Sequence, residues 1–300
     1  MKLETRTGNC FSETKTVYGW SEQTGIHAMA AVVNSLLADG STDLGVGVRF
    51  QYPSGADKTV IYKMEKNIEK TCKDRQIQFL ESGIFENPML TVPAVTVNGL
   101  GREVLENESD KGTVFHDEEK KLSGKSIVQT KWIGMDGMLQ IAIEQGEELK
   151  KRFAPAFIRR ILSHRQALFA DKEIEVAKAR GVSAMRQITE GGIFAALWEL
   201  AKESGQGMVV DMKQILVLQE TIEVCEHFRM NPYQMTSTGS FLMISDDGEA
   251  LADALKQEGI DAAVIGQMTD DNDKIIKNGE DVRYIDRPAP DEILKLYIEK

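Results

Sequence analysis

The 300-residue sequence contains no run of about 18 consecutive apolar residues, the length that a membrane-spanning helix needs. Its first 15 residues are polar and lack the apolar stretch of a signal peptide, so we expect no membrane insertion and no secretion. Only three cysteines occur, Cys10, Cys72 and Cys225, and none belongs to a Cys-x-x-Cys pair. Three widely separated thiols exclude a disulfide framework and disfavour a zinc knuckle, so a reducing cytoplasm is the expected location.

Positive charge is also scarce, because 36 Lys and Arg residues face 47 Asp and Glu residues, for a net charge of −11. An acidic chain repels phosphate backbones, which argues against nucleic acid as a partner. Hydrophobic residues make up 42% of the chain and charged residues 28%, which is the composition of a globular protein. This length suits two domains of ordinary size or one large domain.

Several motifs of common enzymes are missing. No Gly-x-Ser-x-Gly, Gly-x-x-x-x-Gly-Lys-[Ser/Thr] or Gly-x-Gly-x-x-Gly sequence is present, which excludes the usual hydrolase, P-loop and dinucleotide-binding signatures. The four histidines, His27, His116, His164 and His227, form no His-x-His or His-Glu-x-x-His pair. We interpret the acidic run 270–273 as a solvated loop rather than a cation site.

Helix and strand patterns alternate along the first hundred residues. Apolar residues at helical spacing predict a helix over 26–38 that ends at 39–41, and alternation predicts a strand over 44–52. The remaining predictions are a helix over 56–74, with Val60, Met64, Ile68 and Cys72 on one face, and a strand over 87–99 that Pro93 places at a sheet edge or a bulge. The charged segment 101–124 is predicted to be a linker or domain boundary.

The second half of the chain alternates strands with helices more regularly. The predicted strands are 126–132, 181–185, 205–211, 239–245 and 262–268. The predicted helices are 134–145, 193–204, 220–228 and 248–257, together with an amphipathic region over 147–180 in which helices begin at Pro155 and Asp171. Asn278-Gly279 predicts the turn of a hairpin over 274–284. This order favours helices layered on a sheet.

The sharpest candidate binding element is Thr189-Glu190-Gly191-Gly192, between a predicted strand and a predicted helix. Glycines permit close backbone approach, Thr189 is a candidate N-cap, and the first turn of the helix offers free N–H groups to an anion such as phosphate. The alternative is a tight turn with a cap and no ligand, which is the commoner meaning of such a pattern.

Two further segments are candidate binding elements. The hydroxyls of 236–240, which include Ser237 and Ser240, suit a nucleotide or phosphate, or else they satisfy the backbone of their own loop. The segment 131–137 places Lys131, an aromatic ring and two glycines at a strand-to-helix turn. It lines a pocket, or it holds a buried Trp132 with Lys131 at the rim, and the sequence leaves both interpretations open.

The segments 124–137, 181–211, 219–245 and 260–269 together resemble, in this order, the C-terminal domain of the aminoimidazole ribonucleotide (AIR) synthetase superfamily, in its HypE-like, AIR synthase-related branch. The resemblance implies an α+β, two-domain, PurM-like fold, with an N-terminal sheet domain over 1–112 that forms a homodimer and a C-terminal α/β-type domain over 113–300. It also implies that ATP with Mg²⁺ binds between the domains. In this comparison 189–192 forms an anion pocket near Lys131, Ser237 and Ser240.

Residues 26–53 resemble the helix and strand of the family's N-terminal domain, and Asn34 matches a residue of its Ala-x-Asn-Asp pattern. Here the Asp that follows is Ser35, the Asp before Thr-x-Gly-Gly is Gln187, and 80–85 replaces a Gly-Gly-His-Thr-Glu segment. Mg²⁺ requires hard oxygen ligands, so these replacements remove charge from the expected cation site. The reactive C-terminal cysteine of HypE proteins has no counterpart in 296–300.

Two functions therefore remain open. One is ATP-dependent phosphoryl transfer to a carbonyl or amide oxygen in metallocentre maturation, on a client protein and with unusual ligands. The other is a catalytically silent paralogue, a dimeric regulatory protein that binds a nucleotide or another small phosphate-bearing or carboxylate metabolite. The missing carboxylates favour the second slightly.

Overall fold

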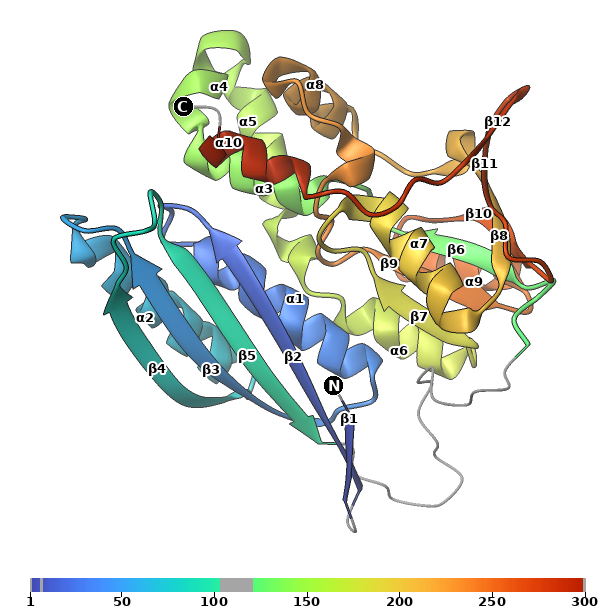
Figure 1. Cartoon of the computed structure of the whole chain (residues 1–300), viewed down its shortest axis with the longest axis horizontal. Helices are drawn as coiled ribbons and strands as arrows, with labels where there is room; N and C mark the ends of the chain where they lie inside the picture. Colours follow the sequence, from blue (N-terminus) through green and yellow to red (C-terminus); the bar gives the residue numbers. More distant parts are fainter. Residues whose placement is uncertain (1, 6–7, 103–120, 299–300) are drawn as a thin grey trace. The chain divides into compact units, whose positions relative to one another are not determined.

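The computed structural model describes residues 2–5, 8–102 and 121–298, which form two compact units (Figure 1). The first unit contains the chain up to residue 112, together with 142–154 and the residues from 297 onward, and the second contains the rest. Both units combine a β-sheet with helices, as the predicted α+β class requires. The predicted boundary between 112 and 113, and most of the predicted linker 101–124, lie outside the described residues.

The first unit is a five-stranded sheet with the order β1-β2-β5-β3-β4. Its strands are β1 (Lys2–Thr5), β2 (Gly8–Tyr18), β3 (Asp43–Tyr52), β4 (Gln78–Glu86) and β5 (Ala94–Arg102), and its helices are α1 (Thr24–Ala38), α2 (Lys58–Asp74) and α4 (Gly146–Arg152). β3 and β4 run parallel because α2 forms the crossover between them, and the other pairs are antiparallel.

The core of the first unit lies between the sheet and α1. Helix α1 packs against β2 and β5, and α2 packs against α1 and β4 (Figure 1). The close approach is possible because β5 carries a glycine at the contact: a Cβ on Gly99 would lie 2.2 Å from Cγ1 of Val32. Every second residue of β3 faces the helices, and Val46, Val48 and Phe50 on this face are buried.

The predicted helices over 26–38 and 56–74 and the predicted strand over 44–52 are confirmed by α1, α2 and β3. The strand predicted over 87–99 is wrong at its start and in its position. It begins at Ala94, after Pro93, and it lies between β2 and β3 in the interior of the sheet rather than at an edge. Strands β1, β2 and β4 are absent from the predictions, because β1 and β2 are largely polar and the apolar residues of β4 stand in adjacent pairs instead of alternating.

The second unit is a seven-stranded sheet with the order β12-β11-β8-β10-β6-β9-β7. Its strands are β6 (Ser126–Thr130), β7 (Ala184–Gln187), β8 (Gly207–Asp211), β9 (Phe241–Ser245), β10 (Ala262–Thr269), β11 (Lys274–Asn278) and β12 (Asp281–Tyr284). Its helices include α3 (Met135–Glu144, whose last residues belong to the first unit), α5 (Pro155–Ser163), α6 (Asp171–Ala179), α7 (Gly192–Ser204), α8 (Gln219–Phe228) and α9 (Gly248–Gln257). Short 3₁₀ turns η1 (His164–Leu168), η2 (Met212–Gln214), η3 (Pro232–Gln234) and η4 (Glu292–Leu294), and the terminal helix α10 (Lys295–Ile298), complete the elements.

The element predictions for this half are largely confirmed. Helices begin at Pro155 and Asp171 as expected, and Gly279, with φ of 65°, turns the predicted hairpin β11–β12. The predicted strand over 181–185 is shifted, because β7 begins only at Ala184. None of the helices in the described part of the chain combines the length and apolar composition needed to cross a bilayer.

The main core of the second unit lies under α7. Ile193, Leu197 and Leu200 of this helix pack on side chains of one sheet face, which include Ile127 and Ile244. Helix α9 packs against β6, β9 and β10. Its first residue, Gly248, approaches Ser126 and Val264, which alternate with core residues of the first face. The two helices therefore cover opposite faces of the sheet.

Candidate functional site

The predicted binding segments of the second unit meet at one edge of its sheet. β6 ends directly before Lys131, β7 ends two residues before Thr189, and β9 begins directly after Ser240. Because β9 runs antiparallel to both β6 and β7, these three points lie at the same end of neighbouring strands. The fold thus brings together loops that lie far apart in the sequence.

The Thr189–Gly192 loop is a tight turn, in which the Gly192 N–H donates to the carbonyl of Thr189 at 3.0 Å. The expected N-cap at Thr189 is wrong. The N-cap of α7 is Gly191, in the left-handed conformation with φ of 74°, and no side chain of its own caps the helix. Instead, the Gly191 N–H donates to Oδ2 of Asp291, at 2.9 Å, from the C-terminal segment of the chain. A carboxylate of the protein itself therefore binds at the start of α7, where the sequence predicts an external anion.

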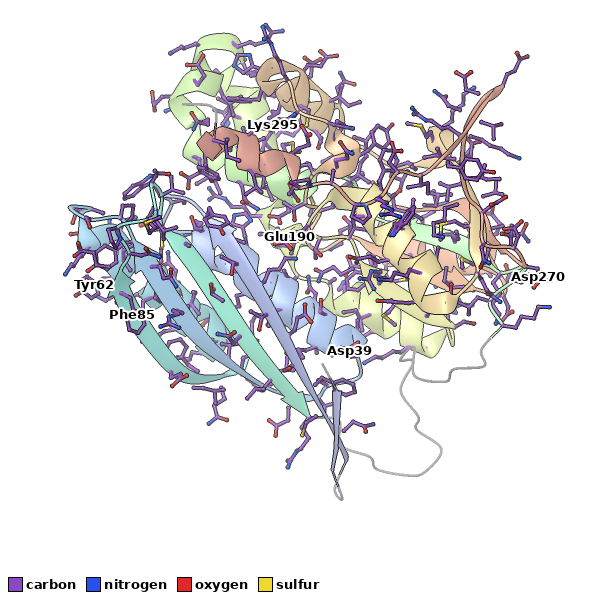
Figure 2. The ribbon with its side chains drawn as sticks, in the orientation of Figure 1. Asp39, Tyr62, Phe85, Glu190, Asp270 and Lys295 are labelled. Carbon is purple, nitrogen blue, oxygen red and sulfur yellow. The ribbon has the colours of Figure 1, made fainter. Side chains whose placement is uncertain are left out.

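The second glycine of the loop packs against backbone. A Cβ on Gly192 would lie 2.5 Å from the carbonyl oxygen of Tyr233 and 2.7 Å from the amide nitrogen of Met235. Gly192 also has φ of 67°, so both the conformation and the available space favour glycine. Glu190, which lies between Thr189 and Gly191, is exposed (Figure 2). The two glycines are accounted for by packing within the unit, and anion binding by this loop stays a prediction.

Asp291 also lies at this edge of the sheet, and no motif in the sequence identifies it as part of the site. Its side chain is 7% exposed, its Oδ1 accepts the N–H of Ile293, and it caps the 3₁₀ turn η4. Burial raises the pKa of Asp291 from 3.8 to about 6, against the opposing effect of its backbone hydrogen bonds, and the nearby Asp136 carboxylate raises it further. The sequence signal was an aspartate after two prolines and before an apolar run, which is typical of a helix cap.

Asp136 is the second buried carboxylate here, 1% exposed in the first turn of α3. It accepts hydrogen bonds from Oγ1 of Thr236 at 3.1 Å and from Nε2 of Gln140 at 3.2 Å. Gln187, which replaces an aspartate of the resembled family, accepts the N–H of Gly239 at 3.1 Å through its amide oxygen. Two carboxylates and a neutral amide thus tie the loops to one another.

Lys131 is buried, with a left-handed backbone at φ of 51°. Its ammonium donates to the carbonyls of Ala167 at 2.6 Å and Phe169 at 3.3 Å, and it lies 2.8 Å from the Glu173 carboxylate. Burial lowers the pKa of Lys131, and Glu173 opposes this shift. All three protons of the ammonium have partners inside the chain, so contact with a phosphate would require them to be exchanged.

The interpretation of Lys131 as a rim residue over a buried Trp132 is wrong in both parts, since the lysine is buried and Trp132 is only half-buried. The indole packs edge-on against His164 with ring centroids 5.1 Å apart. Burial lowers the pKa of His164, with Arg160 acting in the same direction and Glu220 opposing it. His164 belongs to η1, which also contains Ala167, one of the two residues whose carbonyls Lys131 binds.

Ser237 and Ser240 are fully buried. Ser237 Oγ accepts the N–H of Gly134 at 2.7 Å and donates to the carbonyl of Met235 at 3.0 Å, and Ser240 Oγ donates to the carbonyl of Trp132 at 3.0 Å. These are the backbone bonds that the loop alternative expects, and contact with a phosphate stays a prediction. Asn34 belongs to the first unit, where it lies fully buried on α1 beside the half-buried Ser35.

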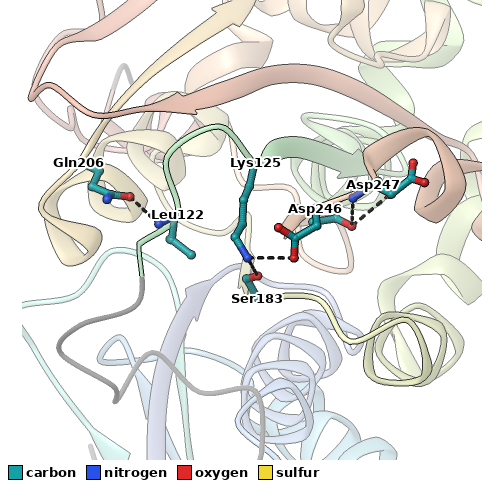
Figure 3. Close-up of polar contacts among 7 residues, drawn as sticks. Leu122, Lys125, Ser183, Gln206, Asp246 and Asp247 are labelled. Carbon is teal, nitrogen blue, oxygen red and sulfur yellow. Dashed lines mark hydrogen bonds and ion pairs between the residues drawn. The ribbon is translucent and has the colours of Figure 1, made fainter.

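The opposite end of β6, β7 and β9 carries a separate polar cluster (Figure 3). Lys125 Nζ donates to Ser183 Oγ at 2.7 Å and to the exposed carboxylate of Asp246 at 2.9 Å. Lys125 therefore links the start of β6 to the start of β7 and the end of β9. Across the described residues, no group of three or more His, Cys, Asp or Glu side chains is arranged to hold a metal ion.

Comparison with known proteins assigns the chain to a family. Residues 123–278 match the family model described as AIR synthase related protein, C-terminal domain, which is slightly more than half of the chain. A protein of Methanocaldococcus jannaschii named for hydrogenase expression and formation is 23% identical over 89% of this chain and 76% of its own length. Carbamoyl dehydratase HypE of Cupriavidus necator is 31% identical, but over only 37% of this chain and 36% of its own length.

Solved structures show the same fold. HypE of E. coli, a hydrogenase maturation protein, superposes with a TM-score of 0.74 at 15% identity, over 94% of this chain and 86% of that one. A HypE structure in complex with ATP gives 0.69 at 15% identity, over 97% and 89%. A HypE–HypF complex gives 0.71 at 19% identity, over 95% and 92%. The predicted resemblance and the predicted two-domain α+β fold are confirmed.

Proposed function

Since the chain belongs to the AIR synthase-related family, in its HypE-like branch, we propose that it acts in metallocentre maturation as a catalytically silent, dimeric partner that binds a nucleotide or a related metabolite. The observation that carries the catalytically silent part of the proposal is the hydrogen bond from Gly191 to Asp291. An acidic side chain of the protein itself occupies the start of α7, where a transferable phosphate is expected in the resembled family. Thr189, in the same loop, stays the predicted contact of a bound nucleotide or metabolite.

The residues at the positions expected to bind Mg²⁺ support the catalytically silent function independently. Mg²⁺ is usually held by one or two carboxylates together with substrate phosphates. The two positions that carry aspartate in the resembled family hold Ser35 and Gln187, and the Gln187 amide is engaged by Gly239. The residues present do not fit Mg²⁺, and we assign no phosphoryl-transfer step through it.

The dimer is supported by the second face of the first unit's sheet. α1 and α2 lie on one face, whereas the other exposes Leu80 and Leu100, at 42% and 55%. Gly45, paired with Leu100 on this face and close to Leu80, leaves the surface flat. An apolar sheet face of this kind suits a self-complementary contact with a second copy. A cytoplasmic location, expected from the cysteine usage, belongs to the same proposal.

ATP-dependent phosphoryl transfer is the second candidate. It is favoured by the likeness to HypE structures, one of them in complex with ATP, and by Asn34, which matches the family pattern. The HypE–HypF complex favours a maturation protein as client in either case. These structures are at most 19% identical to this chain, so they show its fold, and an activity like theirs is a proposal.

The deciding experiment measures ATP binding and phosphate release by the 300-residue protein with Mg²⁺, with the HypE of the ATP complex as the control for binding. The silent-partner function predicts a rise in thermal midpoint with ATP or a related metabolite and no phosphate release above background. Thr189→Ala should reduce that rise, whereas Ser183→Ala, at the other end of the sheet, should not. Phosphate release that depends on the protein would establish the second candidate, and no response to ATP or to phosphate-bearing and carboxylate metabolites would contradict binding altogether.

A further inference from the structure

The segment 286–296, hereafter the strap, passes from the end of β12 to the start of α10 and contacts the start of α7. We propose that Asp291 holds the strap over the start of α7 and that this docking depends on pH. The strap docks more tightly as the pH falls from 8 to 5. This inference does not depend on the proposed function, because it concerns only contacts inside the second unit.

The strap is anchored to the second unit at both ends of its exposed part, at Ile285 and at Asp291. Before it, Ile285 is buried in the core and its N–H donates to the carbonyl of Lys274 at 2.7 Å. Residues 286–290 are exposed and contain two prolines, which limit the conformations of the free segment and reduce the entropy lost on docking. Asp291 then binds the Gly191 N–H through one oxygen and the Ile293 N–H through the other.

A second contact lies beside the first. Glu292 Oε2 accepts the N–H of Asn231 at 3.1 Å, and Lys295 pairs with the same carboxylate at 2.6 Å. Ile293 and Leu296 are 7% and 9% exposed. The strap therefore docks through two carboxylates and two apolar side chains, of which Asp291 is the more deeply buried carboxylate.

The charges around Asp291 do not compensate its ionised form. Its hydrogen bonds come from backbone amides, and no ion pair joins it to a described lysine or arginine. The titratable or charged groups around the strap are Asp136 from α3, Glu190 from the loop before α7, Cys225 from α8, Tyr233 from η3, and Glu292, Lys295, Asp286 and Arg287 from the strap itself. Burial and the charge of the Asp136 carboxylate act in the same direction, so ionisation of Asp291 is disfavoured.

The sign of the pH effect follows from this arrangement. In the docked strap the pKa of Asp291 is raised to about 6, and in the released strap the exposed carboxyl returns to 3.8. The docked state therefore holds the proton more tightly, and docking strengthens as the pH falls through 6 toward 3.8. Between pH 8 and pH 5 the docking equilibrium changes about tenfold.

The test follows the Gly191 amide of the deuterated, ¹⁵N-labelled full-length protein by NMR between pH 5 and 8. We expect its shift to titrate near pH 6, and the exchange protection of the Ile293 amide, corrected for intrinsic rates, to be about tenfold higher at pH 5 than at pH 8. Asp291→Asn should abolish both changes, whereas the matched control Glu292→Gln should keep the Gly191 titration.

A Gly191 amide that does not titrate in the wild-type protein, or that titrates equally in Asp291→Asn, would overturn the proposal. Weaker protection at pH 5 than at pH 8 would also overturn it. The wild-type titration decides the matter even if the Asn variant fails to fold. Because no ligand is added, failure of nucleotide binding leaves these outcomes unchanged, so the two proposals fail separately.

Discussion

The ammonium of Lys131 lies 2.8 Å from the carboxylate of Glu173, and the two side chains are only 5% and 7% exposed. Removing one partner of such a pair leaves an uncompensated buried charge. Lys131→Met should therefore lower the free energy of unfolding by about 3–5 kcal/mol, and Lys131→Met combined with Glu173→Leu should recover much of the loss. Urea unfolding of the single and double variants measures both.

Lys125→Met is the matched control for that pair, because the partner carboxylate of Asp246 is 77% exposed and well solvated. Its ion pair should contribute less than about 1 kcal/mol. A loss for Lys131→Met no greater than that for Lys125→Met would contradict the structural role given to the buried pair.

Gly192 and Gly181 separate two reasons for a glycine, a positive φ angle and a lack of space for a Cβ atom. Both have positive φ, 67° and 63°, but a Cβ would strike backbone atoms only at Gly192, and Gly181 has nothing within 4 Å. Gly181→Ala should cost about 1–2 kcal/mol of stability from the conformation alone. Gly192→Ala should cost about 1–3 kcal/mol more, because it also displaces the segment at Tyr233. Equal losses in thermal or urea unfolding would show that this segment does not press on α7.

The three thiols should differ sharply in reactivity. Burial raises the pKa of Cys72 to about 11 and that of Cys225 to about 12, so almost no thiolate forms at either near pH 8. Cys10 is half-buried on β2. An aromatic disulfide reagent should therefore modify one thiol per native chain and three after denaturation. Cys10→Ser should remove the native reaction, and rapid modification of that variant would argue against the described burial.

Leu100 offers a test of the proposed dimer. Leu100→Asp places a charge on the exposed sheet face, so the sedimentation coefficient should fall from that of a dimer to that of a monomer. Val282→Asp is the control, because Val282 is similarly exposed, at 60%, but belongs to the second unit. A monomeric wild-type protein at micromolar concentration, or a dimer unaffected by Leu100→Asp, would rule out this interface.

The parts of the fold with strong periodicity were predictable from the sequence. Helices α7 and α9 carry regular apolar faces, and Asn278-Gly279 allows hardly any structure other than a turn, so their positions followed directly. Strand β2 was missed because its alternation is largely polar: Thr14 and Thr16 pair with Asn98 and Thr96 across the sheet through side-chain hydrogen bonds.

The place of the Gly191 loop between a strand and a helix was predictable, but the residue that binds its amide was not. The sequence indicated that the loop at Gly191 follows a strand and begins a helix, which is correct. It could not indicate that Asp291, one hundred residues later, supplies the acceptor. Local patterns carry no information on such distant pairs. The same holds for Lys131, whose burial depends on Glu173 from a separate helix.

The order of strands in the first sheet has a consequence for how the chain folds during synthesis. Thr16 of β2 and Thr96 of β5 are hydrogen-bonded neighbours separated by 80 residues, and β5 fills the place between β2 and β3. Until β5 has left the ribosome, the apolar side of α1 has no complete sheet to cover it, and closing so long a loop slows folding. The nascent chain therefore exposes this helix from the time α1 is complete, at Ala38, until β5, which begins at Ala94, has been translated, and apolar surface exposed in this way favours aggregation.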